Sequence, residues 1–292
     1  MGRREKGRGA VTPLLRTTDD SYRQLAYVYD LLMRDAPYGE WLAWAEQMWR
    51  LAGSHPRQVV DLACGTGTLT RALAQTGRQA IGVDLSTDML AVADQKAADR
   101  GGTQGADRVA GAGSVRSARG TTGARDGAVT WLQQDMRELQ LPAAVDSVVC
   151  FCDSLNYLLT EGDWRETFRA VYDALQPNGV FLLDIHSEYK VRTVFGNEVY
   201  AWEESGVYCV WHNELDEAAC AVDEALTLFV EGEDGCYERF DEWHRQRTFP
   251  PDVVRQWLVD AGFEVLMVTG DFRTTGGVRA EDERVFFCAR KR

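Results

Sequence analysis

Apolar runs and helical repeats alternate along the sequence from residue 58 onward. Short apolar runs predict strands, and apolar positions three or four residues apart predict helices between them. Strands that alternate with helices in this way are typical of an α/β fold with a parallel sheet. The predicted strands are 58–62, 80–83, 129–133, 145–152 and 180–185, and the predicted helices are 68–75, 87–98 and 164–175.

Further elements flank this alternating region on both sides. Apolar positions over 20–52 repeat at helical spacing on either side of a break at 37–39, which predicts two helices before the first strand. Two prolines open a predicted helix over 250–260. The segments 262–268 and 284–289 predict two last strands, arranged most simply as an antiparallel pair.

The hydrophobic period changes to two after residue 190. Alternating apolar and polar residues joined by short turns predict an antiparallel β insertion after the fifth strand. The expected division is a core domain of residues 20–190 and 249–292 and a lid or substrate subdomain of residues 191–248. The alternating segments are 199–202, 207–212, 221–230 and 236–243.

Two segments lack the large apolar residues that a packed core needs. Residues 1–19 form a basic leader, and residues 101–127 are rich in Gly, Ala, Arg, Ser and Thr. Neither segment can bury enough surface to offset the entropy lost on ordering. We expect a disordered leader and a flexible insertion between a helix and the next strand.

Charge and cysteine content narrow the class of protein. The 292 residues carry a formal net charge of −13, which repels phosphate backbones and argues against a nucleic-acid substrate. No stretch approaches the roughly 20 apolar residues that cross a bilayer, and the leader lacks the apolar region of a signal peptide. Seven cysteines without metal-like or disulfide-like spacing favour the reducing cytoplasm and predict no metal site.

The strongest chemical signal is the segment 59–67, Val-Val-Asp-Leu-Ala-Cys-Gly-Thr-Gly, in which a strand leads through a turn into a helix. Gly65 and Gly67 allow backbone angles closed to other residues and a close approach to a ligand. Asp84 and Asp135 follow the next two strands in the same way. Because open α/β sheets bind ligands at the carboxyl ends of their strands, we expect these carboxylates to share one adenosine-binding cleft.

The run from Asp61 to Met136 resembles the class I S-adenosylmethionine (SAM)-dependent methyltransferases, whose first motif is an acid followed by G-x-G-x-G. Ala63 stands at the first Gly of that motif. The resemblance implies a Rossmann-like seven-stranded sheet, with strands six and seven as an antiparallel pair, and S-adenosylhomocysteine as the cofactor product. Four segments also resemble an uncharacterised bacterial methyltransferase family with a β lid, itself similar to N-methyltransferases of glycine and amino sugars. These segments are 25–30, 134–137, 153–158 and 244–248.

The resemblance implies contacts along the whole cofactor. Asp84 is expected to hold the ribose, Asp135 and Met136 the adenine, and Tyr29 is expected to close over the cofactor carboxylate. The implied cofactor-binding residues are Tyr29, Asp61, Ala63, Cys64, Gly65, Gly67, Asp84, Leu85, Met89, Asp135, Met136 and Cys152.

The methyl acceptor is expected beyond strands four and five and against the β insertion. Transfer from a sulfonium mainly requires alignment of donor and acceptor, and a base is needed only for a protonated acceptor. The candidate catalytic residues are Asn156, Tyr157, His186 and His244, each with an alternative role in capping or packing. Strand alternation places Glu242, His244 and Gln246 on one face of the insertion.

Several functions stay open at this level. The favoured one is methylation of a nitrogen or oxygen atom of a small molecule, with the insertion as a surface for a homodimer. The alternatives are a non-catalytic SAM-binding or partner-binding protein and an NAD-dependent oxidoreductase on a related fold. The missing third Gly of G-x-G-x-x-G, replaced by Thr70, argues against the oxidoreductase. Methylation of a macromolecule such as tRNA disagrees with the acidic charge balance.

Overall fold

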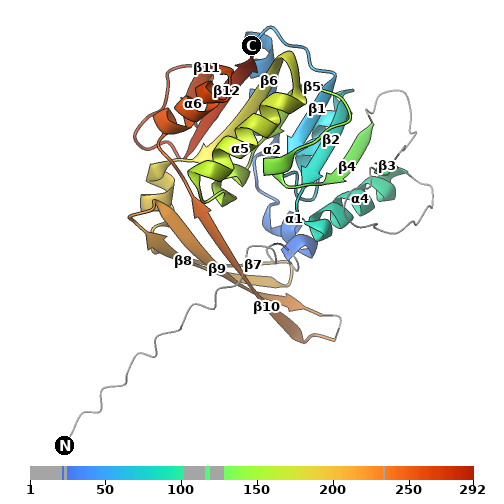
Figure 1. Cartoon of the computed structure of the whole chain (residues 1–292). Helices are drawn as coiled ribbons and strands as arrows, with labels where there is room; N and C mark the ends of the chain where they lie inside the picture. Colours follow the sequence, from blue (N-terminus) through green and yellow to red (C-terminus); the bar gives the residue numbers. More distant parts are fainter. Residues whose placement is uncertain (1–21, 23–24, 102–115, 119–127, 233) are drawn as a thin grey trace, which may run out of the picture.

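The computed structural model describes residues 22, 25–101, 116–118, 128–232 and 234–292. The predicted leader lies outside this range, as does most of the predicted insertion. The main sheet, sheet A, has the strand order β11-β12-β6-β5-β1-β2-β4-β3 (Figure 1). Its strands are β1 (Gln58–Leu62), β2 (Gln79–Asp84), β3 (Arg116–Ala118), β4 (Val129–Gln133), β5 (Val145–Cys150), β6 (Leu175–His186), β11 (Phe263–Gly270) and β12 (Arg284–Lys291).

Sheet A has the arrangement that the sequence predicts, with one addition. The strands β1, β2, β4, β5 and β6 are parallel to one another, whereas β12 runs antiparallel to β6 and pairs antiparallel with β11. The Rossmann-like sheet and its terminal antiparallel pair are therefore confirmed. The short edge strand β3 falls within the predicted insertion and pairs antiparallel with β4. It adds an eighth strand among the described residues.

Helices cover both faces of sheet A because its parallel strands are apolar on both sides. On one face, α2 (Tyr38–Leu51) and α3 (Thr68–Gln75) pack three buried tryptophans and several leucines against the strands. On the other face, α5 (Glu161–Ala174) and α6 (Pro251–Asp260) contribute Trp164 and Trp257 to the core. The helix α4 (Thr87–Gly101) follows β2. No helix among the described residues is long and apolar enough to cross a membrane.

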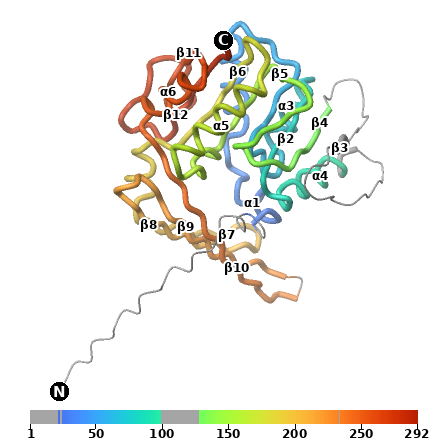
Figure 2. The backbone as a smooth tube through the Cα atoms, in the orientation of Figure 1, coloured from blue at the N-terminus to red at the C-terminus, as the bar shows by residue number. Residues whose placement is uncertain are grey.

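The predicted β insertion is a second sheet, sheet B, with the strand order β10-β9-β8-β7. A π-helical segment, η5 (Lys190–Phe195), leads into it from β6. Sheet B lies at the end of the molecule opposite the C-terminus, beside α1 (Figures 1 and 2). Its antiparallel strands are β7 (Val199–Glu204), β8 (Val207–Asp216), β9 (Ala221–Glu231) and β10 (Tyr237–Arg247).

The first predicted helix is shorter than expected. It is reduced to a 3-10 turn, η2 (Leu25–Tyr27), and one turn of α-helix, α1 (Tyr29–Leu32). The backbone N–H groups of Tyr22 and Leu25 donate to the Glu242 carboxylate of β10, and Leu25 packs on apolar residues of sheet B. These contacts with sheet B, which the helical pattern does not reveal, fix the segment as two short turns.

Candidate active site

A cavity of about 850 Å³ lies where the strands β1, β2, β4 and β5 end. This volume is within the range of roughly 300–1,000 Å³ that is typical of small-molecule sites. Residues from the turns after these strands line the cavity, together with the N-terminal segment and η4 (Ser154–Tyr157). The expected cofactor residues that line it are Tyr29, Ala63, Gly65, Asp84, Leu85, Met89, Asp135, Met136 and Cys152.

The turn after β1 brings the backbone close to the cavity. Ala63 and Gly65 both have positive φ angles, of 57° and 54°. A Cβ atom added to Gly65 would have only the Tyr29 ring nearby, at 3.9 Å, so it would take space from the cavity and not from the core. The absence of a side chain at Gly65 therefore leaves room for a ligand.

Asp84 organises the same turn. One carboxylate oxygen accepts a hydrogen bond from the Gly65 N–H at 2.7 Å, and the other accepts one from the Ser86 N–H at 2.9 Å. Burial raises the pKa of Asp84 despite these hydrogen bonds. Asp84 thus fixes the glycine turn and also presents its carboxyl group to the cavity.

Three expected cofactor residues, Asp61, Cys64 and Gly67, are not among the residues that line the cavity. Asp61 is 3% exposed, accepts a hydrogen bond from Thr70 Oγ1 at 2.6 Å, and has a pKa that burial raises to about 7. A Cβ atom at Gly67 would lie 2.3 Å from the Trp131 ring. Asp61 and Gly67 therefore hold the motif together from behind the cavity wall.

Asp135 and Met136 line the cavity at the end of β4. The Asp135 carboxylate accepts hydrogen bonds from the backbone N–H and the guanidinium group of Arg137. These hydrogen bonds lower the pKa of Asp135, so the side chain is an anion at neutral pH. The arrangement places an acceptor and an apolar side chain at the edge where the sequence predicts the adenine.

The N-terminal segment closes one side of the cavity and is anchored by Asp30. The Asp30 carboxylate accepts a hydrogen bond from Thr66 Oγ1 at 2.6 Å and forms an ion pair with Lys96 of α4. Because Asp30 adjoins Tyr29 in α1, these contacts hold the Tyr29 ring beside Gly65.

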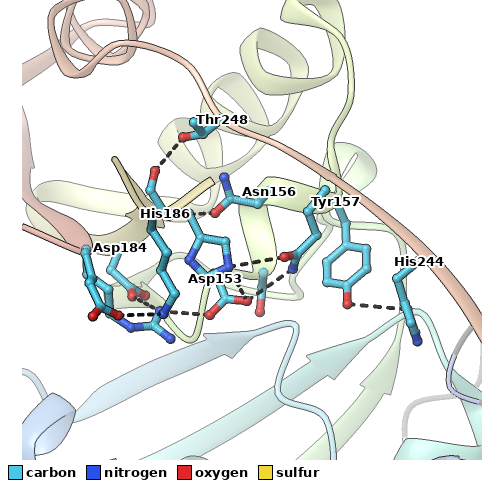
Figure 3. Close-up of polar contacts among 12 residues, drawn as sticks. Asp153, Asn156, Tyr157, Asp184, His186, His244 and Thr248 are labelled. Atoms are coloured by element: carbon cyan, nitrogen blue, oxygen red, sulfur yellow. Dashed lines mark hydrogen bonds and ion pairs between the residues drawn. The ribbon is translucent and has the colours of Figure 1, made fainter. Parts of the chain in front are cut away.

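Aromatic side chains form the far end of the cavity. Tyr22 and Tyr157 both line it, and their hydroxyl groups are hydrogen-bonded to each other. The His244 ring lies behind them, 4.8 Å from the Tyr22 ring, and its Nδ1 is 3.4 Å from the Tyr157 hydroxyl (Figure 3). Only Tyr157 among the four candidate catalytic residues lines the cavity.

Asn156 and His186 are buried next to this end of the cavity, and their hydrogen bonds hold the surrounding strands and turns together. Asn156 is fully buried; its Oδ1 accepts from the His186 N–H and its Nδ2 donates to the Arg247 carbonyl (Figure 3). The His186 ring contacts Asp153 and Gln246 through Nε2, at 3.2 and 3.1 Å. Burial lowers the pKa of His186 against the pull of Asp153, which favours a neutral ring.

Asp153 lies at the centre of an ion-pair network that the sequence does not reveal. It follows Cys152, and both residues adopt positive φ angles, of 57° and 60°. The Asp153 carboxylate pairs with Arg284 of β12 at 2.8 Å, and Arg284 also pairs with Asp184 at 2.7 Å. Burial disfavours the Asp153 carboxylate, but the facing His186 and Arg284 outweigh burial and hold its pKa below the ordinary value. The network ties the end of β5 to sheet B through Gln246.

The alternation predicted for β10 is confirmed. Glu242, His244 and Gln246 are 7%, 5% and 3% exposed, whereas Trp243 is 51% exposed. A similar signal in β9 was missed: Glu224 has the same parity as the buried Val222 and is itself 4% exposed. An acidic residue on the apolar face of a predicted strand is the pattern that identifies Glu224 as a candidate.

Comparisons with known proteins agree with this geometry. The family described as "Methyltransferase domain" matches residues 60–183. A protein of Geobacillus sp. (strain WCH70) named "Putative methyltransferase" is 37% identical over 93% of this chain and 100% of its own length. A glycine/sarcosine N-methyltransferase of Parasynechococcus marenigrum is 27% identical over 87% of this chain and 81% of its own. The crystal structure of a SAM-dependent methyltransferase from Clostridium acetobutylicum superposes with a TM-score of 0.75, at 27% identity, over 92% and 98% of the two chains.

The fold, the cavity and these relatives define a class I SAM-dependent methyltransferase. The chain belongs to this family, and more narrowly to a bacterial family of putative methyltransferases. SAM is its cofactor. The residues present fit that group, because Gly65 leaves room beside the turn and carboxylates stand at the ends of β2 and β4. No group of three metal-ligating side chains occurs among the described residues.

Proposed function

We propose that the protein transfers the methyl group of SAM to a nitrogen or oxygen atom of a small molecule. The observation that carries the proposal is the single cavity that runs from Asp84 and Asp135 to Tyr22 and Tyr157. One end has the residues that suit an adenosine, and the other end is closed by aromatic side chains and sheet B. A small acceptor fits there, facing Cys152, whereas a macromolecule would have to displace the lid.

In this proposal the chain binds and aligns both partners. Bound SAM supplies an electrophilic methyl group, so the protein needs only to orient the acceptor and exclude water. Asp84 holds the ribose hydroxyls, and Asp135 and Met136 hold the adenine. Tyr29 covers the cofactor carboxylate, and Tyr157 contacts the acceptor. Asn156, His186 and His244 act as positioning residues, because none of them lines the cavity.

The experiment that tests the proposal has two stages. Calorimetry first measures binding of SAM and of NAD to the purified protein, and binding of NAD without SAM would favour the oxidoreductase alternative. A screen of amines, amino sugars and phenols then measures formation of S-adenosylhomocysteine. SAM binding without any turnover across the screen would favour the non-catalytic SAM-binding alternative.

Two further properties complete the proposal. The seven cysteines of the described chain are all free thiols, which suits a cytoplasmic protein.

The outer face of sheet B exposes Val199, Tyr208, Val210 and Trp243, and we propose it as the contact between two copies of the chain. Light scattering on the wild type and on Trp243→Lys tests this: the variant is expected to be monomeric, and a monomeric wild type would refute the contact.

A further inference from the structure

The inner face of sheet B carries buried hydrogen-bond acceptors that lack donors. Glu224 on β9 and Asn213 on β8 lie directly opposite each other and are 4% and 1% exposed. Among the described residues, Glu224 Oε1 and Asn213 Oδ1 have no hydrogen-bond partner. His186 Nδ1, at the end of β6, is a third buried atom without a partner in the described chain. If its Nε2 carries the proton that faces Asp153, this Nδ1 is also an acceptor.

Two of these three residues, His186 and Asn213, contact Phe195. The Phe195 ring lies 5.1 Å from the His186 ring and 5.5 Å from the Trp211 ring. The Asn213 side-chain amide donates to the Phe195 carbonyl at 3.4 Å. We call Glu224, Asn213, His186, Phe195 and Trp211 the inner-face cluster. Among the described residues, the cluster has these three unpartnered acceptor atoms and one unpartnered donor, Trp211 Nε1. The excess of acceptors and the aromatic faces suit a cation that has N–H donors.

The inner-face cluster is linked to the far end of the cavity through His244. Glu224 pairs directly with His244 across β9 and β10, which places their side chains next to each other on the same face. The His244 ring in turn contacts Tyr22 and Tyr157, which line the cavity. Burial and then the negative charge of Glu224 raise the pKa of Tyr157, a further sign that the two side chains are close.

Among the charged groups that act on Glu224, Lys190 favours the ionised carboxylate and Asp153 and Asp223 oppose it. Burial raises the pKa of Glu224 to about 8, and Asp153 and Asp223 add to the rise while Lys190 opposes it. Lys190 pairs with Glu283 at 3.2 Å, and its Nζ also lies 5.2 Å from the centroid of the Phe195 ring. Asp223 pairs with Arg245 on the opposite face. Buried polar groups in folded proteins nearly always have hydrogen-bond partners. Glu224 Oε1 therefore needs a partner from outside the described residues, and a ligand amine would supply one.

We propose that Glu224 and Asn213 bind the protonated amino group of the methyl acceptor, which makes the protein an N-methyltransferase. This inference rests on the proposed function and goes beyond it by naming the acceptor class and the residues that select it. An alcohol would leave the Glu224 carboxylate without a matching positive charge, so the inner-face cluster discriminates against hydroxyl acceptors.

Glu224 also removes the proton that blocks the lone pair of the amine nitrogen. The amine passes one proton to the Glu224 carboxylate, and its lone pair then forms the bond to the methyl carbon. The carbon–sulfur bond breaks, and its electron pair stays on sulfur, which becomes a neutral thioether. The proton on Glu224 later leaves to solvent. Because burial raises the pKa of Glu224, its carboxylate is a better proton acceptor than an exposed one.

Matched amine and alcohol probes test the inference. The pairs are glucosamine with glucose, ethanolamine with ethylene glycol, and 2-phenylethylamine with 2-phenylethanol, each at millimolar concentration. We expect an amine to bind the protein loaded with S-adenosylhomocysteine about tenfold or more tightly than its alcohol partner. Glu224→Gln and Asn213→Leu should each abolish this preference and lower kcat/KM for the amine, with unchanged affinity for S-adenosylhomocysteine.

The control variant is Asp223→Asn, which removes the same charge from the neighbouring, opposite face of β9. It should keep the amine preference. The inference is overturned if no amine binds the loaded protein, if the alcohols bind as well as the amines, or if Glu224→Gln keeps the preference. Failure of the proposed function looks different, because a folded protein would then bind neither SAM nor S-adenosylhomocysteine.

Discussion

Glu224 and His244 lie opposite each other on β9 and β10, and both side chains are buried on the inner face of sheet B. A carboxyl group in this position is ionised only at a cost, since Asp153 and Asp223 add to the effect of burial. The stability of the protein should therefore depend on the charge state of Glu224.

Glu224→Gln is expected to flatten the dependence of stability on pH. The pKa of Glu224 is raised to about 8, so its contribution is fully present below the pKa of the unfolded chain and is lost as pH rises through about 8. At about pH 9 the variant should exceed the wild type by on the order of 1–4 kcal/mol in free energy of unfolding. Denaturant titration at about pH 5 and pH 9 measures this.

The difference between variant and wild type isolates Glu224 from Asp61. Burial also raises the pKa of Asp61, to about 7, so Asp61 titrates in an overlapping range in both proteins. If the free energy of unfolding of Glu224→Gln changes with pH in parallel with that of the wild type from about pH 5 to pH 9, the raised pKa of Glu224 is contradicted.

Asp84→Ala is expected to weaken SAM binding about tenfold or more. The substitution removes the proposed acceptor for two ribose hydroxyls and also releases the Gly65 N–H, on a scale of about 1–3 kcal/mol. Calorimetry with S-adenosylhomocysteine measures the loss. Asp94→Ala, on the exposed side of α4, is the control for charge and should bind normally. Unchanged affinity in a folded Asp84→Ala protein would rule out the ribose contact.

Asp30→Ala is expected to raise the KM for SAM with a small effect on folding. Asp30 joins α1 to Thr66 and Lys96, so its loss frees the segment that carries Tyr29. The partly exposed ion pair should contribute less than about 1 kcal/mol to the free energy of unfolding. Steady-state kinetics and thermal unfolding separate the two effects, and a KM equal to that of the wild type would show that the anchor is dispensable.

Ala63→Gly and Gly67→Ala are expected to have opposite effects on stability. Ala63 has a φ of 57°, and Gly relieves the strain of that left-handed conformation by about 1 kcal/mol. Ala at Gly67 would combine a positive φ with a contact 2.3 Å from the Trp131 ring and should destabilise by about 2 kcal/mol or more. Denaturant unfolding measures the change in the free energy of unfolding for both variants. A change of the same sign in both would contradict the prediction.

The strands and helices near the cofactor follow closely from local sequence. The predicted bounds 58–62 and 68–75 coincide with β1 and α3, because an apolar run and an amphipathic repeat specify them without distant contacts. The strand β3 was missed, since its residues resemble the polar segment around them and pair only with the edge of sheet A. The N-terminal segment was predicted as too long a helix because its partner, Glu242, lies on a strand more than 200 residues later.

The site was predictable where it depends on one strand and its turn. Asp84 and Asp135 fall at the ends of apolar runs, and both line the cavity. Asp61 also falls at the end of an apolar run, yet its side chain accepts a hydrogen bond from Thr70 in α3. The spacing of residues in the sequence does not reveal this contact. Asp153 depends on Arg284 from β12, so its role emerges only when the antiparallel end of sheet A is assembled.

The N-terminal segment is bonded at both of its ends. Asp30 attaches one end to the turn after β1, and the N–H groups of Tyr22 and Leu25 attach the other end to Glu242 of sheet B. A tether held at two points transmits a displacement of either end to the other. Admission of the methyl donor and release of the methylated product should therefore be mechanically linked, so that each turnover opens and recloses the same short stretch of chain.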